Sequence, residues 1–449
     1  MRFNQDKLSP FFEIVKIAVP AMLESLVIVA VAVIDTKMIA ILGDKAISAV
    51  SLTDQPKIFV LSVFFALGMA LSFFIARAYG KKDKDEAKEY LFSVLKIGIT
   101  GAVVFGILLF VFARPVMELC SRQAETIELS AEFFSIIMGF MIFQVSSIIL
   151  NGALRGLGKT HVTLIAGLAL GLVDILFNYL LIEGHCGFPR LEVTGNAIAT
   201  VLGSVASLVV SFTAITRQEE FLSFKNFFAH SFKKSEILAD IKSKARNIIL
   251  ENLAMRLGFL ICGVIVSLSP AKDTAVYFVG MLLMNLSFAC GDGLQSAAVA
   301  ILGKNAGMGN MAVVKARLRL FLKTGVIVSL ILSAIYVSMS DLFFGAYFTD
   351  ETYIIQGRTA VYFIASITCF QIGRIIMVAA MRAVGEMKIP RQIASVCVTI
   401  VNPLTIFLLA YVLGFGITGV WQGILITQIF WGIMAFVKGR QCIWQRCQA

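Results

Sequence analysis

Apolar residues run along this chain in long, unbroken stretches that short polar connections separate. Twelve such stretches occur, at residues 14–42, 53–76, 94–113, 129–152, 162–183, 194–216, 247–268, 274–300, 322–340, 355–378, 391–413 and 417–437. All but the shortest reach the roughly 20 residues that a helix needs to cross a bilayer. Barrel strands would instead alternate apolar and polar residues over about ten positions. The pattern therefore predicts an all-α membrane protein with twelve transmembrane helices.

Composition and charge agree with a place in the lipid bilayer. Hydrophobic residues make up 58% of the 449 residues and charged residues only 15%, too few to coat a soluble protein of this size. The net charge of +11 could suggest a nucleic-acid partner, but most Lys and Arg lie at the two termini and in the even-numbered connections. Because cytoplasmic loops carry this excess, we expect both termini in the cytoplasm and a multi-pass protein of the cell membrane, in bacteria the inner one.

An internal duplication relates the two halves. A shift of 227 residues places "PAMLESL" on "NIILENL", which pairs Glu24 with Glu251. The same shift places "ALRGLG" on "AMRAVG", which pairs Arg155 with Arg382. After a three-residue deletion in a second-half loop, "VTG" meets "ITG". Since each copy has six spans, both enter the membrane from the same side, and we expect a pseudo-two-fold axis along the membrane normal.

The duplication predicts two six-helix lobes, at residues 1–216 and 247–437. The connection at 217–246 is basic and partly amphipathic, so we expect a linker on the cytoplasmic lipid surface, and residues 438–449 form a cytoplasmic tail. In repeat-built transporters the substrate path lies between the repeats near the midplane, and one repeat rocks against the other.

Three motifs make the chain resemble the multidrug and toxic compound extrusion (MATE) transporters. Pro20 is followed fifteen positions later by Asp35 and then by "ILG". The segment "ARAYGKKDKDEAK" (76–88) follows the second span, and "GALRGLGKT" (152–160) follows the fourth. The resemblance covers nearly the whole chain. It implies a twelve-helix exporter that uses an inward H+ or Na+ gradient to drive out amphipathic, usually cationic, organic compounds.

Departures from the family pattern indicate a branch. NorM-like exporters carry an acidic residue in the tenth helix where this chain has Gln371. Members of the DinF-like branch, which this chain resembles, use the first-helix aspartate together with an Asn-x-x-x-Asp pair in the fifth helix. Here "DILFN" presents Asp174 and Asn178, the same side chains in reversed order. We therefore expect a DinF-like ion site in the first lobe.

Asp35, Asp174 and Asn178 are the candidate ion-coupling residues. A charge at mid-bilayer costs at least roughly 3 kcal/mol, so such residues persist mainly along cavities or ion paths. Asp174 and Asn178 lie one helical turn apart and can converge on one wall with Asp35. These oxygens could share a proton or hold Na+; a permanently protonated, structural carboxyl is the alternative. No other metal site and no cofactor are expected.

Four further polar residues are candidates for the substrate cavity or a gate. Glu24 lies eleven residues before Asp35 on the same helix face. Glu24 and Glu251 could bind cationic substrate or lock the lobes, or simply favour the positive helix start. Gln144 and Gln371 could donate hydrogen bonds to substrate or pack between helices.

The second half carries three more charges within its spans. Asp292, Arg256 and Arg374 could form an internal ion pair, which would neutralise the buried charges and explain the missing tenth-helix carboxylate.

Other function classes lack their sequence signals. No Walker A loop occurs, and no nucleophile or metal cluster lies at helical spacing, so neither ATP hydrolysis nor an intramembrane enzyme is expected. Cys120 and Cys186 fall in predicted outward connections, and the sequence is compatible both with a disulfide between them and with two free thiols. The leading function is ion-coupled antiport of small organic substrates by a monomer. The alternative is a flippase for a lipid-linked precursor, a relative in the same superfamily; the acidic first lobe favours cationic or neutral cargo.

Overall fold

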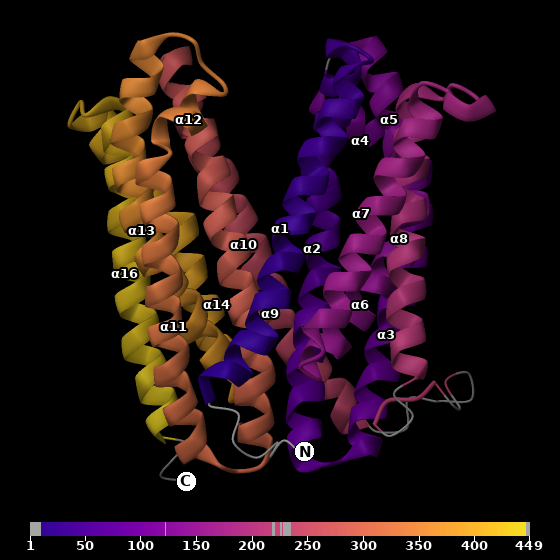
Figure 1. Cartoon of the computed structure of the whole chain (residues 1–449), viewed down its shortest axis with the longest axis vertical. Coiled ribbons are helices and arrows are strands. Elements are labelled where there is room, and N and C mark those ends of the chain that lie inside the picture. Colours follow the sequence, from indigo (N-terminus) through magenta and orange to yellow (C-terminus); the bar gives the residue numbers. More distant parts are fainter. Residues whose placement is uncertain (1–9, 122, 218–220, 225–226, 228–234, 446–449) are drawn as a thin grey trace, which may run out of the picture. The chain divides into compact units, whose positions relative to one another are not determined.

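The computed structural model describes residues 10–121, 123–217, 221–224, 227 and 235–445, and this part of the chain contains helices and connections but no β-strand. Figure 1 shows the helices. The first half contains α1 (Pro10–Ala40), α2 (Asp44–Lys81), α3 (Lys84–Val111), α4 (Ala113–Cys120), α5 (Ala124–Gly139), α6 (Met141–Gly156), α7 (Thr160–Ile182), the short 3-10 helix η2 (His185–Gly187) and α8 (Glu192–Thr216).

The second half repeats this order of helices. It contains α9 (Ser235–Ser267), α10 (Ala271–Gly307), α11 (Met311–Ser338), α12 (Ser340–Gly345), α13 (Glu351–Ala383), α14 (Lys388–Val396), η3 (Cys397–Val401), α15 (Asn402–Phe407), η4 (Leu408–Val412) and α16 (Gly416–Gln445). The segments η3 and η4 are π-helical and flank Pro403, which cannot donate a backbone hydrogen bond.

The prediction of an all-α protein with twelve spans is confirmed. Eleven helices of the described part are long and apolar enough to cross a membrane, and the pair α5 and α6 supplies a twelfth. That pair bends by 49° at Phe140, between Gly139 and Met141. The apolar stretch at 129–152 therefore contains a bend that hydropathy does not predict, because hydropathy reports that residues are apolar and not whether the backbone continues straight.

The chain divides into two compact units. One unit contains Met1–Met22 and Arg246–Ala449, and the other contains Leu23–Ala245. Both boundaries fall inside long helices, α1 and α9, rather than in connections. The start of α1, up to Met22, packs with the second half of the chain, whereas the rest of α1 packs with the first half. The start of α9, up to Ala245, packs with the first half, whereas the rest of α9 packs with the second half. The expected lobes at 1–216 and 247–437 count spans in order and do not include this exchange.

The segment expected as a linker is partly helical. Helix α9 begins at Ser235, inside 217–246. Of the described residues before it, Leu222 is fully buried and Phe224 stacks on Phe212, with 4.7 Å between ring centroids. This piece therefore packs on the first-half helices; its expected place on the lipid surface stays a prediction.

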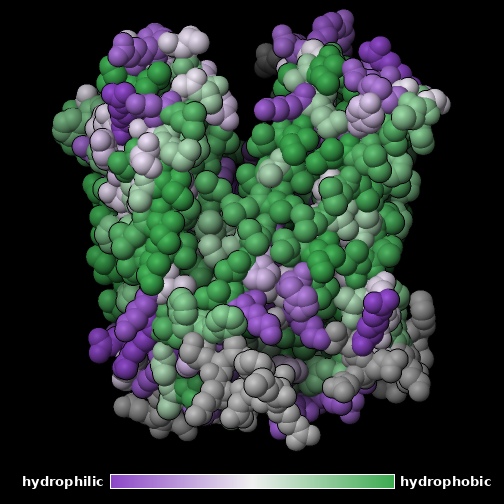
Figure 2. Space-filling model, in the orientation of Figure 1, coloured by the Kyte–Doolittle hydropathy of each residue, from purple (hydrophilic) through white to green (hydrophobic). Residues whose placement is uncertain are grey.

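The visible surface of each unit is apolar along the middle of its helices and hydrophilic toward their ends (Figure 2). Many large hydrophobic side chains of the described residues are exposed, including Val104 and Ile107 on α3 and Ile327 and Leu330 on α11. Soluble monomers rarely expose contiguous apolar areas of such extent. The surface therefore fits a lipid environment.

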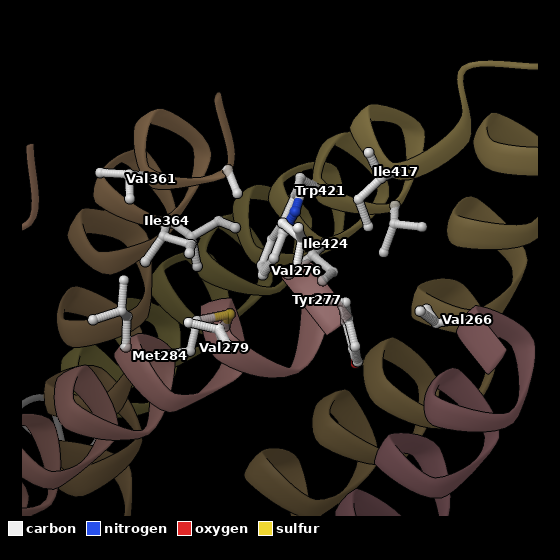
Figure 3. Packing of buried hydrophobic residues seen from close by; sticks show 14 of the residues in the cluster. Val266, Val276, Tyr277, Val279, Met284, Val361, Ile364, Ile417, Trp421 and Ile424 are labelled. Atoms are coloured by element: carbon white, nitrogen blue, oxygen red, sulfur yellow. The ribbon is translucent and has the colours of Figure 1, made fainter. Parts of the chain in front are cut away.

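The second half has a large hydrophobic core around Trp421 (Figure 3). Trp421 of α16 is 1% exposed and packs beside Tyr277 of α10, with 5.8 Å between ring centroids. Gly280 makes room for the indole, because a Cβ at this position would lie 2.5 Å from the ring. The indole therefore fills the space between α10 and α16 at this residue.

In the first half, Gly68 of α2 and Gly152 of α6 allow a close helix approach. A Cβ on Gly152 would collide with the backbone of Gly68, carbonyl oxygen first. Small residues at helix interfaces let backbones pack directly, which is a main source of helix association in membranes.

We expect Gly152→Ala to lower the stability of the protein by about 1–3 kcal/mol, because the added methyl group overpacks a backbone contact. The measurement is thermal unfolding of the purified protein in detergent. Gly373→Ala is the control, since a Cβ there meets no atom within 4 Å and alanine favours the helix. Equal melting temperatures for the two variants would contradict the packing argument.

Candidate functional site

The polar site of the first half is built on three helices. Asp35 of α1 is partly buried, whereas Asn178 of α7 and Asn196 of α8 are both 0% exposed. The Asn178 side chain donates from Nδ2 to Asp35 Oδ1 at 2.9 Å, and Asn196 Nδ2 donates to the same oxygen. Asn196 Nδ2 also lies 3.0 Å from Asn178 Oδ1. Two amides therefore hold the Asp35 carboxylate in one orientation.

Asp174 adds a second carboxylate next to this group. It is 3% exposed, lies one turn before Asn178 on α7, and accepts a hydrogen bond from the Thr200 side chain. It also lies close enough to Asp35 for the two charges to interact. Among the described residues, Asp174 Oδ1 and Asn196 Oδ1 have no hydrogen-bond partner. The site therefore presents buried oxygen atoms whose bonding capacity is not filled by the protein.

A cation that interacts with both carboxylates is already partly neutralised by another acid. Lys57 of α2 interacts electrostatically with both Asp35 and Asp174. Its ammonium nitrogen lies 2.7 Å from Asp54 Oδ1. The pair of acids is thus not balanced by a matching pair of bases within this group.

Close packing of α7 and α8 brings these side chains together. A Cβ on Gly203 of α8 would lie 2.8 Å from the Leu170 carbonyl oxygen and 3.2 Å from Asp174 Cβ. Gly171 of α7 gives similar room to Val31 of α1, whose side chain would collide with a Cβ at this glycine. Larger residues would separate the helices and with them the polar groups.

Glu24 belongs to a different group of the same unit. Its carboxylate is 3% exposed and pairs with Arg155 of α6, with 2.5 Å between Oε1 and Nη2. The Thr163 hydroxyl of α7 donates to Glu24 Oε2 at 2.5 Å. Both oxygens are therefore occupied by groups of the first half.

Glu251 has the equivalent partner in the second half. Its Oε1 lies 2.9 Å from Arg382 Nη2, and Arg382 Nη1 donates to Gln295 Oε1 at 3.1 Å. Glu251 Oε2 has no hydrogen-bond partner among the described residues. The shift of 227 explains the difference, because Thr163 is replaced by Pro390, which offers no donor.

The remaining candidates are placed separately. Gln144 is half-buried on α6, and Gln371 is 0% exposed on α13 with neither amide atom hydrogen-bonded within the described part. Asp292 and Arg256 are exposed and interact electrostatically. Arg374 is buried, and its guanidinium lies 3.5 Å from the centre of the Trp431 ring.

The second half has no copy of the polar site. With the shift of 227, Asp35 corresponds to Cys262 and Asn178 to Thr405; with the three-residue deletion, Asn196 corresponds to Val420. Cys262 and Val420 belong to the hydrophobic core around Trp421, as does Ile424, the counterpart of Thr200, which Figure 3 shows beside the indole. The same scaffold therefore holds a polar group in one repeat and an apolar core in the other.

Sequence reasoning missed Asn196 and Thr200 as site residues. The segment "VTGNAIAT" indicated the repeat, but one polar residue in an apolar span does not show which helix it faces. Arg155 and Arg382 were also interpreted as repeat markers and not as partners of the two glutamates. Within the described residues, no three His, Cys, Asp or Glu side chains form a group that could hold a metal, and Cys120 and Cys186 are free thiols.

The described part of the chain has up to twelve membrane spans in two compact units that each bury charged groups, which is the architecture of a polytopic membrane protein and fits a transporter. The MatE family model matches residues 20–180 and 248–434, so the chain belongs to this family. The match confirms the resemblance to the MATE transporters.

Similar proteins span the whole chain. A Thermotoga maritima protein named probable multidrug resistance protein NorM is 25% identical over 428 residues, which cover 93% of this chain and 89% of that protein. Crystal structures of MATE in the bent and in the straight conformation each match with a TM-score of 0.88, at 20% and 18% identity. Each covers 98% of this chain, with 96% and 97% of the solved chain matched. This likeness confirms the twelve-helix fold.

We expect Arg155→Met to destabilise the protein by about 3–5 kcal/mol, because it leaves the buried Glu24 carboxylate without its counter-charge. The double variant Glu24→Gln/Arg155→Met should regain most of this loss. Thermal unfolding in detergent measures both. Arg114→Met is the control, since the Arg114 and Glu118 side chains are 78% and 52% exposed and such pairs contribute at most about 1 kcal/mol. A wild-type melting temperature for Arg155→Met would contradict a stabilising role.

Proposed function

We propose that this chain is a secondary active antiporter that exports amphipathic, cationic organic compounds in exchange for H+ or Na+ by alternating access. The observation that carries the proposal is the pair of Asp35 and Asp174 in the first half, together with the unpartnered oxygen atoms beside them. No cofactor is part of this scheme; the coupling ion is the only inorganic species it requires.

Electrostatics explain why this group would take up an ion. Two carboxylates in a medium of low dielectric repel each other strongly, and a proton or a monovalent cation between them relieves that repulsion. Hard cations prefer oxygen ligands, and Asp35, Asp174, Asn178 and Asn196 all offer oxygen atoms. The same set therefore supports H+ or Na+, and the choice between them needs transport measurements.

The site's restriction to one repeat supports a DinF-like rather than a NorM-like mechanism. Cys262, Thr405 and Val420 occupy the equivalent positions in the second half, and Gln371 stands where NorM-like exporters carry an acid. Arg374 also places a cation near Gln371, one turn along α13, which disfavours a second cation there.

Bending of α1 would connect the ion to the cargo. Asp35 lies on α1, whose Pro20 removes a backbone hydrogen bond and so allows a kink. Solved relatives are described in bent and straight conformations. An ion couples to transport only if it binds one conformation more tightly than the other. We propose that ion binding at Asp35 favours the bent form, which releases cargo outward.

We expect cargo to contact residues whose side chains can still form hydrogen bonds. Gln371 has two unpaired amide atoms, and Gln144 occupies the matching position of the first half. Glu24 and Glu251 are already paired with Arg155 and Arg382, so a cationic cargo would have to displace a guanidinium. We therefore assign the two glutamates to fastening of helix ends, and the two glutamines to hydrogen bonds with cargo.

We expect Asp35→Asn to abolish concentrative transport, because a neutral amide cannot exchange a proton or Na+. The test uses purified protein in liposomes with ethidium as cargo, and pH and Na+ gradients imposed separately. Wild type should accumulate ethidium under one of the two gradients, and Asp35→Asn under neither. Asp44→Asn, at an exposed carboxylate, serves as the control. Accumulation by Asp35→Asn at the wild-type level would refute the proposed ion site.

We expect Asn196→Leu to raise the ion concentration needed for half-maximal transport by about 10- to 100-fold. A hydrogen bond to a charged group contributes about 1.5–3 kcal/mol, and Asn196 donates one to Asp35. Titration of the active gradient in the same liposomes measures the shift. Ser204→Ala is the control on the same helix, since this hydroxyl bonds the Thr200 carbonyl. Identical titration curves for Asn196→Leu and Ser204→Ala would argue against a role for Asn196.

A further inference from the structure

We propose that Arg317 is a positioning residue that fastens the start of α1 to the second half, and that this anchor forces α1 to bend near Pro20 when the ion site changes state. Tyr90 fastens the start of α9 to the first half in the equivalent way. The proposal rests on the antiport function proposed above only where it refers to coupling; the anchors themselves are features of the structure.

The α1 anchor consists of two contacts from one guanidinium. Arg317 of α11 lies 2.7 Å from Glu13 Oε2 through Nη2, and its Nη1 donates to the Pro10 carbonyl oxygen at 2.8 Å. Further along α1, Met22 sits directly against Gly293 of α10, where a Cβ would lie 2.5 Å from the Met22 backbone nitrogen. The first three turns of α1 are therefore held on α10 and α11.

The α9 anchor centres on Asp240. The Tyr90 hydroxyl of α3 donates to Asp240 Oδ2 at 3.1 Å, and Lys244 binds both carboxylate oxygens at 2.5 and 2.6 Å. Tyr90 stacks on Phe74 of α2 with 4.2 Å between ring centroids, and the Lys244 ammonium lies 5.1 Å from the centre of the same Phe74 ring. A charged and aromatic contact thus holds the start of α9 on α2 and α3.

The two anchors are copies of one another. The shift of 227 residues maps Glu13 onto Asp240 and Tyr90 onto Arg317. In each anchor a carboxylate near the start of one repeat's first helix therefore meets a donor near the start of the other repeat's third helix. An incidental surface pair has no reason to recur at the matching place, so this arrangement reflects the duplicated scaffold. The donors differ in kind, a guanidinium in one and a phenol in the other.

The consequence for α1 follows from where its parts are held. Residues up to Met22 belong to one compact unit, and Leu23 onward, with Asp35, belongs to the other. Any rearrangement between these parts must be absorbed within the helix, and Pro20 makes this turn its weakest point. Without the anchor, the start of α1 could follow its outer part as a rigid rod and no bend would form.

The α9 anchor acts on a helix without an ion site. Asn247 and Cys262 stand where α1 has Pro20 and Asp35. A regular helix without proline resists bending, and a buried thiol carries no coupling ion. The two anchors should therefore differ in effect: loss of the Arg317 contact impairs coupling, whereas loss of the Tyr90 contact leaves it intact.

Charge exchange in full-length protein tests the α1 anchor. Arg317→Glu and Glu13→Arg should each lower the initial rate of ethidium transport about tenfold, the effect of about 1.4 kcal/mol. The double exchange Glu13→Arg/Arg317→Glu should return the rate to within about twofold of wild type. Arg319→Glu, at an exposed position of the same helix, should stay within about twofold. A double exchange no better than either single variant would overturn the anchor.

A conformational readout separates this proposal from the transport function. Nitroxide labels on Leu119→Cys and Leu342→Cys, which are 89% and 63% exposed on different units, report inter-unit distances by electron paramagnetic resonance after the eight native cysteines are replaced. Arg317→Glu should change the distance distribution and the double exchange should restore it, whether or not ethidium proves to be cargo. An unchanged distribution for Arg317→Glu would overturn the proposal.

Tyr90→Phe provides the second comparison. Removal of its hydroxyl should lower the melting temperature but leave the number of ethidium molecules moved per coupling ion at the wild-type value. Arg317→Met should reduce that ratio at least about threefold. Equal ratios in the two variants would contradict the assigned difference between the anchors.

Discussion

Burial of charge inside a helical bundle is the constraint on which this structure depends. A carboxylate away from water needs a counter-charge or hydrogen bonds, since its desolvation costs several kcal/mol. Glu24 and Glu251 meet the requirement with a guanidinium counter-charge, from Arg155 and Arg382, each within its own unit. Asp35 and Asp174 instead rely on neutral amide and hydroxyl donors, and Asp174 Oδ1, like Glu251 Oε2, has no hydrogen-bond partner among the described residues. The first solution stabilises a fold, and the second leaves room for an exchangeable ion.

Duplication supplies the scaffold for both solutions, and a few substitutions decide which one each half uses. Replacing Asp35, Asn196 and Thr200 by Cys262, Val420 and Ile424 turns the same position into a hydrophobic core. That core gains apolar burial of roughly 1.5–3 kcal/mol per large side chain, which the polar site forgoes. The proposed ion site is thus confined to the first half, and the second half has an apolar core at the equivalent place. Substitutions at equivalent positions of one repeat thus make a symmetric fold chemically asymmetric.

Much of the fold follows from sequence because the signals are additive over many residues. Twenty apolar residues specify a span whatever their order, and one offset held over four helices specifies the repeat. Helical spacing alone puts Asp174 and Asn178 on one face of α7. The bend at Phe140 escapes such reasoning, since Phe140 and its neighbours are as apolar as the rest of the span. Side-chain partners across helices escape it too: Asn196 reaches Asp35 only because Gly203 brings α8 against α7.

The exchange of helix starts could be inferred least of all, because hydropathy orders the spans and says nothing about which of them pack together. Yet it determines how the ion site can act. If α1 lay wholly within one unit, a change at Asp35 would move only the side chains around it. Arg317 binds Glu13 near the start of α1, and Asn178 and Asn196 bind Asp35 near its end, so both ends of this helix are held by contacts. In the proposed mechanism, charge neutralisation at Asp35 bends a helix that is fixed at both ends, and Pro20 places the bend at a defined turn. In this proposed mechanism the polar site and the anchor depend on each other: ion binding at Asp35 drives the change of shape, and the Arg317 contact keeps the start of α1 in place.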